Sequence, residues 1–183
     1  TAWAKERRHF DKLGLSTIAI DLRGHGLSSR NNEKNFYAFD RFIDDITALS
    51  QQQNLGEYVL VGHCFGGMLS IGYGAKFQES LHSLVLVDTS YKPPFFGSNF
   101  VEKILLQKIL GLFLKFIPDF RIDGHTDFQK FVGTSDIDIK RILSDVLHTS
   151  LRSYLMICES MMSYDAKTLL DKIKKPTLVI DGT

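Results

Sequence analysis

The segment that decides the fold reads Tyr58-Val59-Leu60-Val61-Gly62-His63-Cys64-Phe65-Gly66-Gly67. An apolar, strand-like run stops at Gly62, and a helix-like segment follows immediately after Cys64. Cys64 has glycines two residues before and two residues after it, which is the nucleophile-elbow pattern with cysteine in the place of the usual serine. Such a turn exposes one side chain at the end of a strand and at a helix N-terminus, where negative charge is favoured. The segment therefore predicts an exposed, nucleophilic thiol.

Short apolar runs alternate with helix-like segments on both sides of this turn. Apolar residues recur at helical spacing over residues 39–49, and small and apolar residues continue a helix after the turn. The apolar runs are almost continuous, which is typical of parallel strands buried on both faces. We therefore expect an α/β fold with a doubly wound, mostly parallel sheet, whose strands are Ser16–Ile20, Tyr58–Val61, Leu84–Val87 and Thr177–Ile180.

A long helical stretch separates the last two of these strands. Residues 91–168 show no clear strand pattern and several helix-like segments, one of them running from Val101 to Phe116 before Pro118. The interpretation is a core of residues 1–90 and 169–183 with an inserted helical cap of residues 91–168. The apolar helix is read either as a lid over a pocket or as an interfacial helix on lipid, with basic residues Lys103, Lys108 and Lys115. Either reading favours an apolar acyl or alkyl substrate.

The composition limits the possible functions. The 183 residues include 22 Lys and Arg and 21 Asp and Glu, which gives a net charge of +1. This near-balance does not indicate the basic surface that binds nucleic acid. Two cysteines, Cys64 and Cys158, indicate neither a disulfide scaffold nor a zinc site. No apolar run approaches the roughly 20 residues that span a bilayer. We expect a protein of the cytoplasm without a metal or another cofactor, and the sequence does not predict its oligomeric state.

Four motifs, taken in order, resemble the α/β-hydrolase family in its lid-bearing branch. They are the loop Asp21–Ser28, the turn Val61–Gly67, the strand Leu84–Asp88 and the segment Ile173–Gly182. The resemblance implies a catalytic acid and histidine beyond Gly182 and an oxyanion loop before Trp3. We therefore expect the chain to be incomplete at both ends, and residues 1–183 alone to be inactive.

The resemblance also implies roles for the residues at the turn. Cys64 would be the nucleophile, and the backbone N–H of Phe65 would donate to the oxyanion hole. The three elbow glycines would keep side chains away from the turn; they are Gly62, Gly66 and Gly67. The alternative for Cys64 is a small buried core residue that happens to lie between glycines.

Other polar residues have less specific readings. Asp88 ends a strand on the side where active sites form in such sheets, so it is a possible catalytic acid. His63 and His25 are interpreted as structural residues. His125 and His148 lie in the predicted cap, where lid or surface roles are expected.

The predicted function is hydrolysis of an apolar carboxylic ester, thioester or lactone. Cysteine at the elbow is similar to dienelactone hydrolases and to polyhydroxyalkanoate synthases, so acyl transfer through a Cys64 thioester is the alternative. A third reading is a hydrolase-fold protein without catalytic activity. The expected partner is a small apolar acyl compound. Nucleic acid is not expected, and membrane contact would require the interfacial reading of the helical cap.

Overall fold

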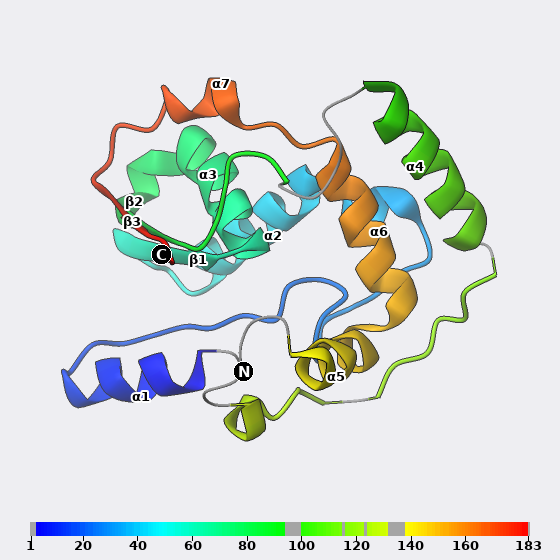
Figure 1. The fold of residues 1–183 in the computed structure, drawn as a ribbon. Coiled ribbons are helices and arrows are strands. Elements are labelled where there is room, and N and C mark those ends of the chain that lie inside the picture. Colours follow the sequence, from blue (N-terminus) through cyan, green and yellow to red (C-terminus); the bar gives the residue numbers. More distant parts are fainter. Residues whose placement is uncertain (1–2, 94–99, 115, 123, 132–137, 183) are drawn as a thin grey trace. The chain divides into compact units, whose positions relative to one another are not determined.

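The computed structural model of the chain is drawn in Figure 1. It describes residues 3–93, 100–114, 116–122, 124–131 and 138–182.

Two compact units make up the structure. The first unit comprises residues 1–36 and 112–156, and the second comprises residues 37–111 and 157–183. Each unit has its own internal packing. The division into a core and a cap that the sequence indicates stays a prediction.

The second unit contains a three-stranded parallel sheet, in the order β1-β2-β3. Val61 of β1 pairs with Val85 of β2, which pairs in turn with Leu178 of β3. The parallel α/β architecture predicted from the apolar runs is therefore confirmed. The strands are β1 (Tyr58–His63), β2 (Leu81–Val87) and β3 (Thr177–Ile180).

The helix α3 (Phe65–Phe77) packs against β1 and β2 and connects them. Small residues allow this close approach: a Cβ at Gly74 would lie 3.0 Å from Leu84 Cδ2. The other side of α3 meets α2 (Phe39–Gln52), where a Cβ at Gly72 would lie 2.9 Å from Ile43 Cδ1. The resulting core buries apolar side chains of helices and sheet together, among them Phe42, Ile43, Met68, Leu69, Ile71, Leu84 and Leu86.

Further helices follow the second strand. The apolar helix predicted over 101–116 is present as α4 (Phe100–Leu114), although Lys115 and the side chain of Lys103 lie outside what the structure describes. The described part of 91–168 contains no strand, as predicted. Its other elements are η3 (Phe128–Phe131), α5 (Ile139–Thr149), α6 (Leu151–Met162) and, at its end, the start of α7 (Lys167–Leu170).

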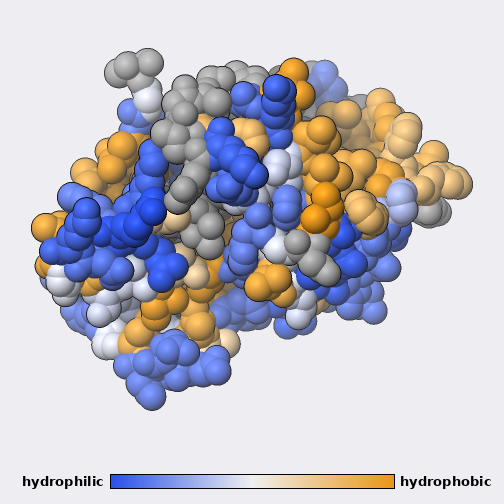
Figure 2. All heavy atoms as spheres, turned by 90° about the horizontal axis from the view of Figure 1, so that it is seen from below, coloured by the Kyte–Doolittle hydropathy of each residue, from blue (hydrophilic) through white to orange (hydrophobic). Residues whose placement is uncertain are grey.

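The surface carries apolar as well as polar residues on the face that Figure 2 shows. Helix α4 exposes several apolar side chains, including Leu105, Leu112 and Phe113. Among the described helices, none combines the length and the apolar character that crossing a bilayer requires.

The first unit contains α1 (Ala4–Lys12), the loop after residue 20, a short helix η1 (Lys34–Tyr37) at its boundary, and α5. Polar contacts tie the loop to the segment that follows α4 in the sequence. His125 Nε2 lies 2.6 Å from Asp21 Oδ2, and Arg121 Nη1 donates to the Ser28 carbonyl at 3.0 Å. The loop is therefore held by side chains about 100 positions away in the chain.

The strand predicted at Ser16–Ile20 is not present. These residues have no regular secondary structure, and Ile18 and Ile20 are 52% and 40% exposed. A strand exists only where a neighbour completes its hydrogen-bond ladder, and no described residue forms a backbone hydrogen bond with this segment. The apolar pattern is typical of a strand, but none of the residues that the structure describes supplies the pairing partner that a strand requires.

Candidate active site

Cys64 occupies the turn between β1 and α3 and has an unusual backbone conformation. Its φ is 49° and its ψ is −115°, while its neighbours His63 and Phe65 belong to a strand and a helix. A non-glycine residue in such a region costs about 1–3 kcal/mol, so the surrounding structure must hold it there. The thiol is exposed to solvent. Cys64 thus lies on a sharp turn between strand and helix with its side chain exposed, whereas the alternative reading expected it to be buried. Its role as a nucleophile stays a prediction.

Hydrogen bonds hold both the backbone N–H and the backbone carbonyl of Cys64. The Cys64 N–H donates to the Val87 carbonyl at 3.0 Å, which anchors it to the end of β2. The Cys64 carbonyl accepts from the Gly67 N–H at 3.0 Å and from the Thr89 hydroxyl at 2.7 Å. Two strand ends and the first turn of α3 thus determine the position of the nucleophile candidate.

At two of the three elbow glycines, a side chain would collide with neighbouring atoms. A Cβ at Gly62 would fall within 3.0 Å of the Gly66 carbonyl and of Ser70 Oγ, and a Cβ at Gly67 would lie 2.5 Å from Thr89 Cβ. The same crowding was predicted at Gly66, and this prediction is wrong. Apart from its chain neighbours and the nearby backbone of its own helix, no described atom would lie within 4 Å of a Cβ there. The crowding is produced by the turn itself and by Thr89.

The first residue of α3 contributes both a backbone donor and a packed ring. The N–H of Phe65 has no acceptor among the described residues, as befits the first residue of a helix. The Phe65 ring makes edge-to-face contacts with Phe39 and Phe42, with centroid distances of 5.5 Å and 5.2 Å. The ring packs into the unit, so the backbone is the part of Phe65 available for an oxyanion.

Asp88 follows β2 directly and lies at the same sheet edge as Cys64. Its φ is 43°, and its N–H donates to the Ile180 carbonyl of β3 at 2.8 Å. Its Oδ2 lies 3.8 Å from Nε2 of His63, the residue before Cys64. Both side chains are partly exposed, at 57% for Asp88 and 39% for His63. The structure thus brings an imidazole and a carboxylate together beside Cys64, a pairing that the sequence analysis did not predict.

Two further residues at the site were missed in the sequence. Thr89 binds the Cys64 carbonyl, and its position directly after a strand end was the available signal. Tyr164 donates to the Met68 carbonyl in the first turns of α3 at 2.9 Å and stacks on Phe39. Burial and the nearby charge of Asp40 raise the pKa of Tyr164 to about 12. No local pattern indicated that residue 164 would return to α3.

The second cysteine differs from the first in its environment. Cys158 of α6 is half-buried, and burial raises the pKa of its thiol to about 11, with a further contribution from Cys64. At neutral pH its thiol is therefore protonated and a poor nucleophile.

Three of the four histidines of the first unit have a hydrogen-bond partner in that unit. His25 Nδ1 lies 3.2 Å from the Arg23 carbonyl, and burial lowers the pKa of this imidazole. His125 contacts Asp21, and His148 Nδ1 lies 2.8 Å from the Ser144 carbonyl. Within the described residues, no group of three or more His, Cys, Asp or Glu side chains could hold a metal ion.

Comparison with known proteins identifies the family. The family described as alpha/beta hydrolase fold matches residues 2–141, which is most of the chain. The chain therefore belongs to the α/β-hydrolase family, and the predicted fold class is confirmed.

Curated relatives include hydrolases and an acyltransferase. The chain is 30% identical over 109 residues to a "Serine hydrolase-like protein" of Mus musculus, covering 56% of the chain and 34% of the relative. It is 37% identical over 74 residues to 2-(acetamidomethylene)succinate hydrolase of Mesorhizobium japonicum, covering 40% and 26%. It is 36% identical over 90 residues to 1-acylglycerol-3-phosphate O-acyltransferase of Arabidopsis thaliana, covering 45% and 21%. The chain thus spans between 21% and 34% of the length of these relatives.

Solved structures show the same fold. A thermophilic esterase from Thermogutta terrifontis is similar with a TM-score of 0.72 at 23% identity, covering 100% of this chain and 66% of that one.

The glycine contacts predict different effects on stability for two alanine substitutions. Gly62→Ala places a Cβ against the backbone of Gly66, which cannot move without distorting the turn, so we expect a loss of about 2–4 kcal/mol. Gly66→Ala meets no such atom, and because alanine favours helix it should be neutral or stabilising by up to about 1 kcal/mol. Urea unfolding of the two variants measures the difference. Equal stability of both would contradict the close approach at Gly62.

The environments of the two cysteines predict selective alkylation. With iodoacetamide at pH 7.5, Cys64 should be modified first, because its thiol is exposed while burial keeps the Cys158 thiol protonated. A pKa near 11 leaves roughly 100-fold less thiolate than an ordinary cysteine has at that pH. Peptide mass spectrometry with time gives the order, and unfolding in guanidinium should remove the difference. Faster modification of Cys158 in the folded protein would contradict this assignment.

Proposed function

We propose that the protein hydrolyses a carboxylic ester, thioester or lactone with an apolar acyl group, using Cys64 as the nucleophile. The observation that carries the proposal is the exposed Cys64 thiol on a turn with positive φ, at the N-terminus of α3. Membership of the α/β-hydrolase family supports it, as do relatives whose names describe hydrolases.

The chemistry would proceed in two steps. The Cys64 thiolate attacks the acyl carbon, the bond to the leaving group breaks, and the leaving group takes up a proton. Water then attacks the resulting thioester, which releases the carboxylic acid and returns the thiol. In both steps negative charge develops on the acyl oxygen. The Phe65 N–H, which lacks an acceptor among the described residues, would stabilise this charge.

A charged partner would support the proton transfers. Among the described residues of the second unit, Asp88 is our candidate for the acid, because it ends β2 at the same sheet edge as Cys64. Its contact with His63 would keep an imidazole oriented beside the nucleophile. We assign His63 a positioning or structural role and do not place it in the reaction.

Acyl transfer is the second candidate function. The first step would be the same, and an alcohol would replace water as the acceptor of the acyl group. The relative named as an O-acyltransferase is the observation in favour of this alternative. The third possibility is a family member without catalytic activity, in which the Cys64 thiol would not react with an acyl substrate.

Turnover of an activated acyl thioester by the full-length protein tests the proposal. We expect free acid to form without any alcohol acceptor, and Cys64→Ala to lower kcat/KM by about 1,000-fold or more, because the alanine variant cannot form the thioester. Cys158→Ala is the matched control and should retain activity within a few-fold, since the Cys158 thiol is half-buried and protonated.

The other outcomes identify the alternatives. Product that appears only when an alcohol is added would contradict hydrolysis and establish acyl transfer. Equal rates for wild type and Cys64→Ala would contradict the role of Cys64 under either function.

A further inference from the structure

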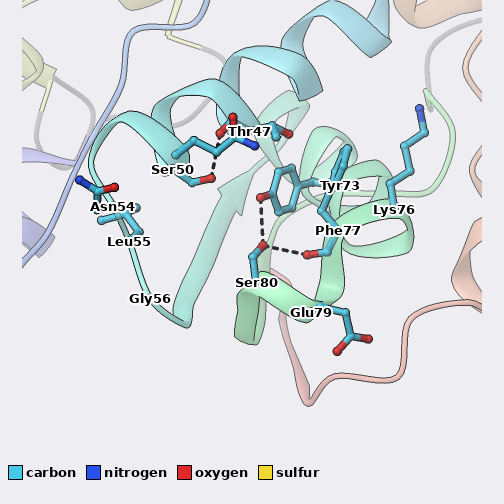
Figure 3. A pocket seen from close by; sticks show the side chains of 11 residues that line it. Thr47, Ser50, Asn54, Leu55, Gly56, Tyr73, Lys76, Phe77, Glu79 and Ser80 are labelled. Carbon is cyan, nitrogen blue, oxygen red and sulfur yellow. Dashed lines mark hydrogen bonds between the residues drawn. The ribbon is translucent and has the colours of Figure 1, made fainter.

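A hollow of about 780 Å³ lies in the second unit at the far end of α3 from Cys64. The last turns of α2 and α3, the loop of residues 54–56 and the helix η2 (Gln78–Ser80) surround it (Figure 3). Because α3 has 13 residues, at 1.5 Å each the hollow is about 20 Å from the turn at Cys64. It is therefore separate from the candidate active site.

Hydroxyl groups beside and at this hollow form a chain of hydrogen bonds with a fixed direction. Tyr58 donates to the Tyr73 hydroxyl at 2.7 Å, and Ser80 donates to the Phe77 carbonyl at 2.8 Å. The contact of 3.0 Å between Tyr73 and Ser80 then has Tyr73 as the donor, because the Ser80 proton is already used. On α2, Ser50 donates to the Thr47 carbonyl at 2.9 Å. All these protons are used internally. Tyr58 does not line the hollow and Tyr73 is buried, so the partly exposed Ser50 and Ser80 hydroxyls are the ones that face a ligand, and they have only acceptor lone pairs left for it.

The charges around the hollow favour a cation. Helix α2 ends there without a basic residue in its last turn, so the partial negative charge of its C-terminus is not neutralised by its own side chains. The Glu79 carboxylate lies at the rim. Among the described residues that line the hollow, Lys76 is the one basic residue. It pairs instead with Asp40 at 2.5 Å and points away from the Tyr73 and Ser80 hydroxyls in Figure 3.

Apolar surface lies beside these acceptors. Leu55 and Phe77 line the hollow, and each is 36% exposed. A cation that also has an apolar or aromatic body could cover both side chains, and the Phe77 ring face attracts positive charge in addition.

We propose that this hollow is a second ligand site, which binds a small organic cation of the ammonium or amidinium class with an apolar body. The N–H donors of such a ligand meet the acceptor lone pairs of the Ser50 and Ser80 hydroxyls, and its charge meets Glu79 and the C-terminus of α2. Its apolar body covers Leu55 and Phe77. The site is independent of the proposed reaction at Cys64, which the ligand does not touch.

Binding of benzamidine and of benzamide tests the proposal, because the two molecules have the same shape and differ in charge. Titration into ¹⁵N-labelled protein at constant ionic strength should shift the amides of Leu55, Phe77 and Ser80 in a saturable way. We expect benzamide to bind at least about tenfold more weakly, since it lacks the charge and one strong donor group.

Two substitutions at the rim sharpen the test. Glu79→Gln removes the carboxylate and should weaken benzamidine binding about threefold or more. Asp40→Asn should also weaken it, although residue 40 does not line the hollow, because the released Lys76 ammonium would repel the cation. Glu33→Gln, an exposed change in the first unit, is the control and should leave the affinity unchanged.

Three results would overturn the proposal. They are equal affinity for benzamidine and benzamide, absence of saturable shifts at Leu55, Phe77 and Ser80, and an affinity for benzamidine in Glu79→Gln and Asp40→Asn that equals that of the wild type.

Discussion

The positive φ of Cys64 is the constraint on which the rest of the site depends. A strand has to end and a helix has to begin within one residue, and only a backbone turned into this region makes that possible. The cost of about 1–3 kcal/mol is offset by the hydrogen bonds of the Cys64 N–H to Val87 and of its carbonyl to Gly67 and Thr89. Gly62 is required because a side chain there would collide with the Gly66 backbone.

The same constraint gives the site its chemical character. Because the turn places Cys64 before the first residue of α3, the thiol is exposed and lies at the positive end of a helix. The parallel register of the sheet brings the end of β2 to the end of β1, so Asp88 and Thr89 reach this edge from a distant part of the sequence. Cys158, half-buried in α6, lacks these features and keeps its proton.

The sequence predicted the local elements well, because each carries its own pattern. The G-x-C-x-G spacing indicated the turn, and the apolar runs at 58–61, 84–87 and 177–180 indicated parallel strands that the structure contains. The run at Ser16–Ile20 is also rich in apolar residues, but no described residue pairs with it, and the composition of a run does not show whether a partner strand exists. The sequence also could not show that Tyr164 returns to α3 or that the hydroxyls of Tyr58, Tyr73 and Ser80 form one chain, because these contacts join separate elements.

The most direct test of the central claim is the mass of the full-length protein after rapid quenching with an activated acyl thioester. If Cys64 is the nucleophile, the intact protein should gain the mass of one acyl group, and peptide mapping should locate that group on Cys64. The Cys64→Ala variant should gain no such mass, whereas Cys158→Ala should behave like the wild type. An acyl group found on another residue, or one that persists in Cys64→Ala, would contradict the account.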